Sequence, residues 1–175
     1  MLCRYRYANG IAGFQVLNVL FLCTGNSARS VMAEMYLNHA GKGRFRAFSA
    51  GSAPKGEVHP LSLETLRAAD IAVEGARSKS WDEFAPATAP HMHLVITVCD
   101  NAAGESCPIW PGAPARSHWS FPDPAAAEGS EAERRAAFRR IFGDIRKAID
   151  ALIALPIDDL DDAALSRHVN AIGPH

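Results

Sequence analysis

The feature that most constrains the fold is an apolar run that leads directly into a polar loop and then into a helical pattern. The run Val16–Leu22 (VLNVLFL) is short and rich in β-branched and large apolar residues, which predicts a strand buried on both faces. The loop Cys23–Ser30 (CTGNSARS) follows, and from Ser30 to His39 apolar residues recur at helical spacing. A strand, a loop and a helix in this order are typical of an α/β domain with a parallel sheet.

Strand and helix patterns continue to alternate along the rest of the chain. Further strands are predicted at Arg44–Ser49, Leu94–Val98 and Ser117–Phe121, and further helices at His59–Asp70 and Ser130–Leu155. We therefore expect a single-domain open parallel sheet of about four strands in flavodoxin-like order, with helices on both faces. In such sheets ligands bind beyond the carboxyl ends of the strands, and Cys23 and Cys99 each follow a predicted strand.

Composition limits the function classes. The 175 residues are 48% hydrophobic and 21% charged, which suits one folded domain. Lysine and arginine total 18 and aspartate and glutamate total 19, so a net charge of -1 gives no strong field that would favour nucleic acid or an anionic membrane. The chain has no apolar run of about 18 residues, and Met1–Gln15 lacks the apolar core of a secretory signal, so we expect a soluble, cytoplasmic monomer.

We expect the domain to span residues 16–156. Residues 1–15 are predicted to form a flexible N-terminal extension, and Cys3 within it is interpreted as an incidental thiol. The tail 157–175 is acidic in its first half and is expected to be loosely held.

The loop after the first strand has the residue types that a tetrahedral oxyanion requires. Backbone N–H groups of the loop and of the helix N-terminus point toward an anion bound there, and Arg29 adds a planar, bidentate guanidinium. The same positive potential is expected to lower the pKa of Cys23 and favour the nucleophilic thiolate, to which Ser30 can donate a hydrogen bond. Asn26 tolerates the left-handed backbone that a tight loop demands. The alternative is an ordinary strand-to-helix turn with a buried thiol. The predicted oxyanion-binding residues are Thr24, Gly25, Asn26, Ser27, Ala28, Arg29 and Ser30.

The octet Cys23–Ser30 resembles the phosphate-binding loop of the low-molecular-weight protein tyrosine phosphatase superfamily. Other segments resemble the arsenate reductase branch of that superfamily, and the resemblance runs from about Val16 to Pro156. These segments are Phe48–Ser52, Val58–Pro60, Arg77–Phe84, Val95–Asp100, Cys107-Pro108, His118-Trp119 and Asp123-Pro124. The resemblance implies the low-molecular-weight phosphatase fold and the reduction of arsenate to arsenite.

Reduction of arsenate requires more than one thiol. If Cys23 attacks arsenate and water leaves, a second thiol must attack the sulfur of the adduct, and Cys99 is the candidate. Cys107 could then attack Cys99 and move the disulfide outward. The resemblance implies this relay, with no bound cofactor and with an external reductant of the thioredoxin or the glutaredoxin and glutathione type. The alternative for Cys99 is a core thiol at the end of a strand.

Asp123 follows the last predicted strand, in the sequence Phe-Pro-Asp-Pro. The resemblance implies that Asp123 is the general acid, which would protonate the leaving oxygen; an aspartate before proline is otherwise common in turns. Tyrosine phosphatases of this fold resemble one another in placing aromatic residues after the Asp-Pro pair, whereas Ala125–Ala127 follow here, so only Trp110 and Trp119 remain to contact an aromatic ring.

A monovalent cation site is a further implication of the resemblance. Some relatives bind potassium through a set of side-chain oxygens that Asn26, Glu34 and Ser49 match, but Ser80 stands where an aspartate is expected, which argues against the site. The segment Arg77–Lys79 is interpreted as part of the rim or as a contact for a redox partner.

His91 and His93 share one face of the predicted central strand and could hold a metal ion, but the sequence offers no third ligand, so no metal site is predicted.

Two other functions stay open. The chain could be a phosphatase acting on phosphotyrosine or small phosphate esters, for which Cys23, Arg29 and Asp123 are sufficient. It could also be a non-catalytic oxyanion sensor, although a sensor needs neither a nucleophile nor a general acid.

Overall fold

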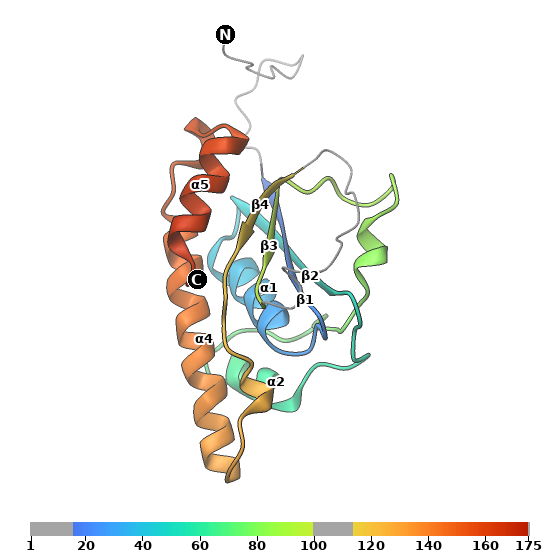
Figure 1. Cartoon of the computed structure of the whole chain (residues 1–175), viewed down its shortest axis with the longest axis vertical. Coiled ribbons are helices and arrows are strands. Elements are labelled where there is room, and N and C mark those ends of the chain that lie inside the picture. Colours follow the sequence, from blue (N-terminus) through green and yellow to red (C-terminus); the bar gives the residue numbers. More distant parts are fainter. Residues whose placement is uncertain (1–15, 100–113, 175) are drawn as a thin grey trace.

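The computed structural model describes residues 16–99 and 114–174 of the chain (Figure 1). The strands are β1 (Leu17–Cys23), β2 (Phe45–Gly51), β3 (Leu94–Thr97) and β4 (Ala115–His118). The α-helices are α1 (Arg29–Ala40), α2 (Pro60–Arg67), α4 (Glu131–Ile153) and α5 (Asp162–Ile172), and the 3-10 helices are η1 (Trp81–Phe84), η2 (Pro124–Ala126) and η3 (Ile157–Asp159).

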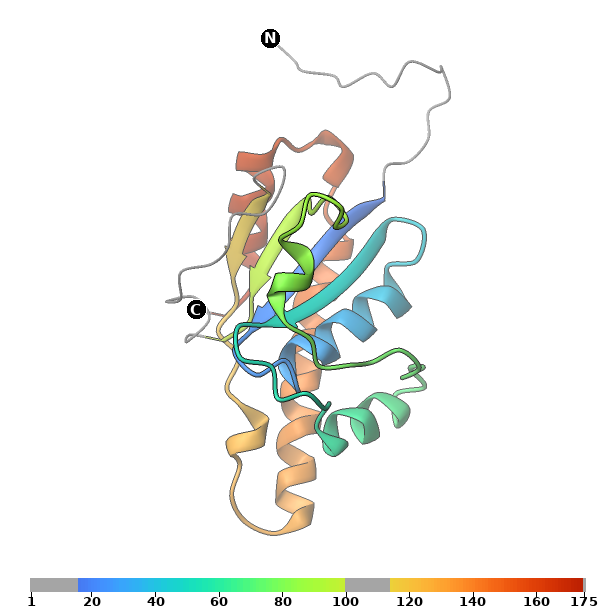
Figure 2. The same ribbon diagram turned by 90° about the vertical axis from the view of Figure 1, so that its right-hand side faces the viewer.

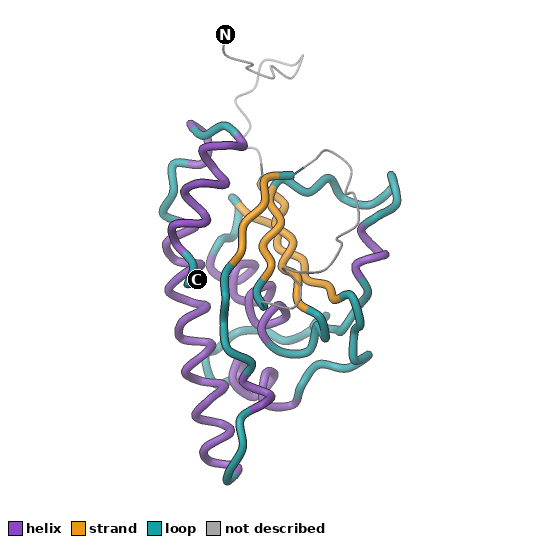
Figure 3. Tube along the Cα trace, in the orientation of Figure 1, coloured by secondary structure: helices purple, strands orange, loops and turns teal. Residues whose placement is uncertain are grey.

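The four described strands form one parallel sheet in the order β2-β1-β3-β4. The predicted parallel sheet of about four strands in flavodoxin-like order is therefore confirmed. The strand β4 begins two residues before the predicted start at Ser117, and the chain leaves the sheet after Trp119, whose N–H still donates to Thr97 O (2.8 Å). The loops that follow the carboxyl ends of the strands gather at the lower end of the sheet (Figure 3).

The two faces of the sheet are covered unequally. On β1, Val19 and Phe21 belong to the large hydrophobic cluster that includes residues of α1, α4 and α5, whereas Leu20 and Leu22 belong to a small cluster with Phe84 of η1. Figure 2 shows η1 in front of the sheet and the α-helices behind it. Helices thus cover both faces, as predicted, but among the described elements the α-helices lie on one side of the sheet and the 3-10 helix η1 lies on the other.

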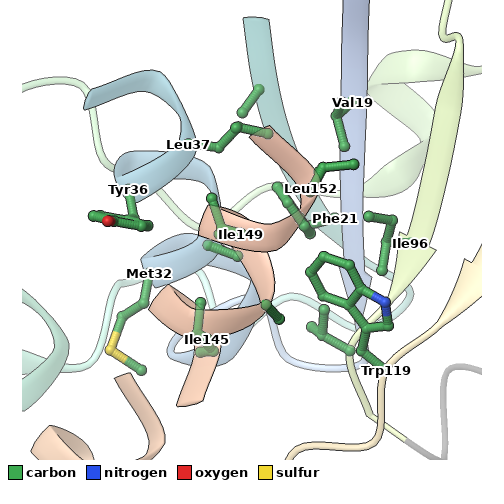
Figure 4. Packing of buried hydrophobic residues seen from close by; sticks show 14 of the residues in the cluster. Val19, Phe21, Met32, Tyr36, Leu37, Ile96, Trp119, Ile145, Ile149 and Leu152 are labelled. Atoms are coloured by element: carbon green, nitrogen blue, oxygen red, sulfur yellow. The ribbon is translucent and has the colours of Figure 1, made fainter. Parts of the chain in front are cut away.

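The helix α4 supplies much of the main core. Its apolar residues at helical spacing, including Ile145, Ile149 and Leu152, are buried against β1 and α1 (Figure 4). The predicted capping box begins the helix: Ser130 Oγ accepts from Glu133 N–H, and Ser130 N–H donates to Glu133 Oε2 (2.8 Å).

The prediction of a loosely held tail is wrong. The helix α5 packs beside β4 and buries Leu165 and Val169 in the main core. Trp119 Nε1 donates to Val169 O (2.9 Å), and Gly173 lies so close to the indole of Trp119 that a Cβ atom there would be 1.8 Å from it. The prediction relied on the acidic residues at the start of the tail and did not take the apolar face of this helix into account. The predicted extension, residues 1–15, lies outside the described residues.

Candidate active site

The loop between β1 and α1 places a cysteine thiol against a serine hydroxyl. Cys23 Sγ lies 2.9 Å from Ser30 Oγ, and Asn26 N–H donates to the same sulfur (3.2 Å). Ser30 Oγ already accepts from Asn26 Nδ2 (2.8 Å), so its hydroxyl hydrogen is free to point at the sulfur. This is the arrangement that the sequence predicted for a hydrogen-bonded nucleophile.

Asn26 fixes the shape of the loop. Its backbone is left-handed (φ 41°), as expected, and its side chain is completely buried. Nδ2 donates to Ser49 Oγ (2.9 Å) as well as to Ser30, and Oδ1 accepts from Lys79 N–H (2.7 Å). Gly51 makes room for the loop, because a Cβ atom there would lie 2.4 Å from Thr24 O.

The helix α2 holds the second half of the loop. Ser27 O accepts hydrogen bonds from His59 N–H (2.9 Å) and from the buried Ser62 Oγ (3.1 Å). His59 is the N-cap of α2, and its ring stacks on Phe138 of α4 with the centroids 4.7 Å apart. The loop is therefore tied to the sheet on one side and to the helical layer on the other.

The loop surrounds a pocket of about 210 Å³, a size that suits a small oxyanion. Loop residues 23–29 line the pocket together with Ala53, Lys55 and Asp123. Ser30 is completely buried and does not line the pocket, because it lies behind the sulfur of Cys23. Lys55 was not singled out in the sequence; it lies in an irregular segment after β2, where spacing gives no signal.

Arg29 joins the loop to the segment after β4. Its Nη1 donates to Phe121 O (2.9 Å), and its Nη2 lies 3.4 Å from Asp123 Oδ2. The side chain of Arg29 is 15% exposed and that of Asp123 is 42% exposed, so the carboxylate stands at the mouth of the pocket. Asp123 is also the N-cap of η2, where Oδ1 accepts from Ala125 N–H (3.1 Å). Asp123 thus caps a turn and also lies beside the pocket, so the two interpretations of this residue do not exclude each other.

Cys99 follows β3 and is brought to the same edge of the sheet as Cys23. Both cysteines are buried, and neither forms a disulfide within the described residues. Cys99 Sγ lies 3.9 Å from Thr24 Oγ1 of the loop. The prediction that both cysteines share one rim is therefore confirmed. Cys107 lies outside the described residues.

The expected lowering of the pKa of Cys23 is not found. Burial is the largest effect and raises the pKa of Cys23, the hydrogen bonds from Ser30 and from Asn26 N–H oppose this, and the neighbouring Cys99 raises it further. Cys23 therefore stays a thiol to a higher pH than an exposed cysteine.

No aromatic side chain lines the pocket among the residues that the structure describes. Trp119 is completely buried in the main core, with its Nε1 bonded inside the fold, so the expectation that it could contact a substrate ring is wrong. Its place within the predicted strand Ser117–Phe121 did not show whether the side chain points into the core or toward the rim. Trp110 lies outside the described residues.

The predicted potassium ligands are brought together, but potassium does not fit among them. Lys79 Nζ lies 3.0 Å from Glu34 Oε2 and 3.3 Å from Ser49 Oγ. The lysine ammonium thus lies where a cation bound by these oxygens would be. Lys79 is 6% exposed, so its interpretation as a rim or partner residue is also wrong.

His91 and His93 contact each other, and His93 also accepts a hydrogen bond from the backbone. The rings are 4.9 Å apart, and His93 Nδ1 accepts from Asn18 N–H (2.9 Å). Within residues 16–99 and 114–174, no three His, Cys, Asp or Glu side chains are grouped as metal ligands.

The fold and the Cys23-to-Arg29 loop define a class of protein. The chain belongs to the family described as low molecular weight phosphotyrosine protein phosphatase, whose model matches residues 18–169. The match reaches into α5, in agreement with its packing against the core.

Several curated relatives are arsenate reductases. An arsenate reductase of Bacillus licheniformis is 38% identical over 131 residues, which are 75% of this chain and 91% of that protein. A solved structure described as an arsenate reductase in the phosphate binding state is 25% identical, with a TM-score of 0.62 and coverage of 79% of this chain and 98% of the other. A thioredoxin-dependent arsenate reductase of Corynebacterium glutamicum is 28% identical, with a TM-score of 0.54 over 77% of this chain and 62% of that one.

None of the described helices is both long enough and apolar enough to span a membrane.

Proposed function

We propose that this protein reduces arsenate to arsenite and that Cys23 and Cys99 supply the two electrons. The observation that carries the proposal is the presence of two buried thiols at the carboxyl ends of adjacent parallel strands, beside a pocket that holds an arginine. A phosphatase needs only one of these thiols. The arsenate reductases among the relatives support the same function.

Arsenate would bind in the pocket through Arg29, the loop N–H groups and Lys55. The hydrogen bond to Phe121 O and the contact with Asp123 hold the guanidinium plane of Arg29 in place before the oxyanion arrives. Phosphate has the same shape and charge, and one similar structure is described as a phosphate-bound state. Phosphate is therefore a suitable probe for the pocket.

In the first step, Cys23 Sγ would attack arsenic and form a sulfur–arsenic bond. As Cys23 attacks, its thiol proton passes to the carboxylate of Asp123, and Asp123 gives a proton to one arsenate hydroxyl, which leaves as water. Because burial keeps Cys23 protonated, this proton transfer is part of the step.

In the second step, the sulfur of Cys99 would attack the sulfur of Cys23, and the thiol proton of Cys99 passes to an oxygen of the leaving arsenite. A Cys23–Cys99 disulfide forms, the sulfur–arsenic bond breaks, and its electron pair stays on arsenic, which leaves as arsenite. Cys107 would then attack Cys99 and release Cys23. An external thiol reductant completes the cycle, of the thioredoxin type, as the name of the Corynebacterium glutamicum relative indicates for that protein, or of the glutaredoxin and glutathione type.

A single-turnover experiment tests the proposal. The fully reduced protein is mixed with arsenate without external reductant, arsenite is quantified, and disulfides are mapped by mass spectrometry. We expect about one arsenite per protein and a disulfide that contains Cys99. Cys99→Ser should form no arsenite, whereas Cys3→Ser is the matched control and should react as the wild type does. Arsenite formation by Cys99→Ser would refute the relay.

Phosphatase activity is the second candidate function, and the family model favours it. Because no described aromatic side chain lines the pocket, small phosphate esters are better substrates for this site than phosphotyrosine. Cys99→Ser should hydrolyse p-nitrophenyl phosphate at the wild-type rate, so this assay also shows that the variant is folded.

A further inference from the structure

The ammonium group of Lys79 lies inside the fold, next to the loop Cys23–Ser30, which is called the catalytic loop below. The side chain of Lys79 is 5% exposed and that of its ion-pair partner Glu34 is 12% exposed. Three oxygens surround Nζ: Glu34 Oε2 at 3.0 Å, Ser49 Oγ at 3.3 Å and Arg77 O at 3.4 Å. A carboxylate, a hydroxyl and a carbonyl are the oxygen types that bind a monovalent metal ion.

This ammonium is connected to the nucleophile through hydrogen bonds. Ser49 Oγ donates to Glu34 Oε2, so Ser49 must accept from Asn26 Nδ2, and Asn26 also donates to Ser30 beside the sulfur of Cys23. Because a carboxylate can only accept hydrogen bonds, Glu34 sets the direction of each hydrogen bond in this series.

The backbone of Lys79 holds the same asparagine from the other side. Lys79 N–H donates to Asn26 Oδ1 (2.7 Å), and Lys79 O accepts from Gly51 N–H (2.9 Å) at the end of β2. Both polar atoms of the Asn26 side-chain amide are therefore held: Nδ2 by Ser49, and Oδ1 by the backbone of Lys79. Asn26 is the residue with left-handed backbone in the loop. A carboxylate that is largely covered, as that of Glu34 is, needs a positive charge nearby, and Lys79 provides it without any ion from solution.

We infer that Lys79 is a positioning residue that acts as a built-in monovalent cation: its ammonium fills an oxygen-lined site under the catalytic loop and makes the loop independent of potassium. The ammonium group and a potassium ion carry the same charge and bind the same oxygens, so one excludes the other. The inference concerns how the loop is held and does not depend on arsenate being the substrate.

Two substitutions separate charge from volume. Lys79→Ala leaves the oxygens of Glu34, Ser49 and Arg77 without their cation and opens space for one, whereas Lys79→Met removes the charge and fills the space. Lys147→Met is the matched control, because the side chain of Lys147 is 82% exposed and pairs with Asp144 on the surface of α4.

The melting temperature is measured in potassium chloride, methylammonium chloride and choline chloride at equal ionic strength. The wild type and Lys147→Met should melt at the same temperature in all three salts. Both Lys79 variants should melt about 10 °C lower in choline, which is the expected loss for a broken buried ion pair. Potassium or methylammonium should restore about half of that loss in Lys79→Ala and none in Lys79→Met.

Phosphate affinity is the second readout, measured by calorimetry. Lys79→Ala should bind phosphate about tenfold more weakly in choline and regain affinity in potassium. A wild type that potassium stabilises over choline, a Lys79→Met variant as stable as the wild type, or a folded Lys79→Ala variant with no response to either cation would each overturn the inference. These readouts contain no arsenate, so failure of the proposed reduction would leave them unchanged.

Discussion

The guanidinium of Arg29 reaches across the pocket to within 3.4 Å of the carboxylate of Asp123. Arg29 is the first residue of α1, and Asp123, the N-cap of η2, follows it ninety-four positions later in the sequence. This contact brings the proposed oxyanion ligand and the proposed acid to one pocket, and it makes the geometry of each dependent on the other.

Arg29→Lys keeps the charge but loses the planar fork, so the ammonium cannot contact Phe121 O and a bound oxyanion together as the guanidinium can. We expect the single-turnover rate of arsenite formation to fall by about 100-fold or more, while the melting temperature changes by only a few degrees. Quenched-flow measurement of arsenite checks the rate. A variant with the wild-type rate would mean that charge alone is sufficient at this position.

Lys55 adds a second positive charge to the pocket wall. Because this charge lies near solvent, we expect Lys55→Met to weaken phosphate binding by about threefold to tenfold in low salt and by less at high ionic strength. Calorimetry at two salt concentrations measures the change. Lys147→Met is the control, because Lys147 is exposed and does not line this pocket, and it should bind phosphate as the wild type does. Equal loss in the two variants would exclude a specific role for Lys55.

The raised pKa of Cys23 predicts a pH dependence of stability. The folded state holds this proton to higher pH than the unfolded state, so the contribution of Cys23 is complete below the unfolded value of about 8.5 and is lost as pH rises through the folded value. Above pH 8.5, the wild type should therefore lose stability relative to Cys23→Ser. Urea unfolding of both proteins from pH 7 to pH 10 measures the difference, and parallel curves would contradict it.

Ser30 donates to the sulfur and lowers the pKa of Cys23, against the effect of burial. Ser30→Ala removes that bond, and we expect alkylation of Cys23 by iodoacetamide at pH 8 to slow by about tenfold. Peptide mapping of the alkylated protein identifies the thiol that reacts. Alkylation of Cys23 in Ser30→Ala at the wild-type rate would contradict this prediction.

Gly173 lies against Trp119 with no room for a side chain. We expect Gly173→Ala to lower the free energy of unfolding by about 2–3 kcal/mol, because the indole or the segment after α5 must move. Gly143→Ala is the matched control. A Cβ atom at position 143 of α4 would meet nothing within 4 Å, so this change should raise the free energy of unfolding by about 0.5–1 kcal/mol. Unfolding in urea compares the two variants.

Much of this arrangement could be predicted from the sequence, because the carboxyl ends of parallel strands meet at one edge. That rule was sufficient to place Cys23 and Cys99 together, and the spacing of the loop was sufficient to place Arg29 at the start of α1. Lys55 and Lys79 could not be found in this way. Their positions depend on how irregular segments after β2 and before η1 fold back over the loop, and no periodic pattern describes such segments.

The sequence also could not give the sign of the pKa shift of Cys23. A positive loop predicts a lowered value and burial a raised one, and the balance depends on how deeply the sulfur is covered, which only the packing of the site determines. The prediction of a loosely held tail was wrong for a related reason. The acidic residues of the tail indicate which face of its helix is exposed, but they do not show that Leu165 and Val169 on the other face are buried.

The bond from Ser120 N–H to Pro174 O, together with the contact between Gly173 and Trp119, has a consequence for synthesis of the chain. The catalytic loop and its strand leave the ribosome early, but the segment that carries Asp123 is braced by residues that are translated more than fifty codons later. In a nascent chain that has exposed residues only up to 156, all the residues that line the pocket are present, but Trp119 and Ser120 still lack their contacts with residues 169–174.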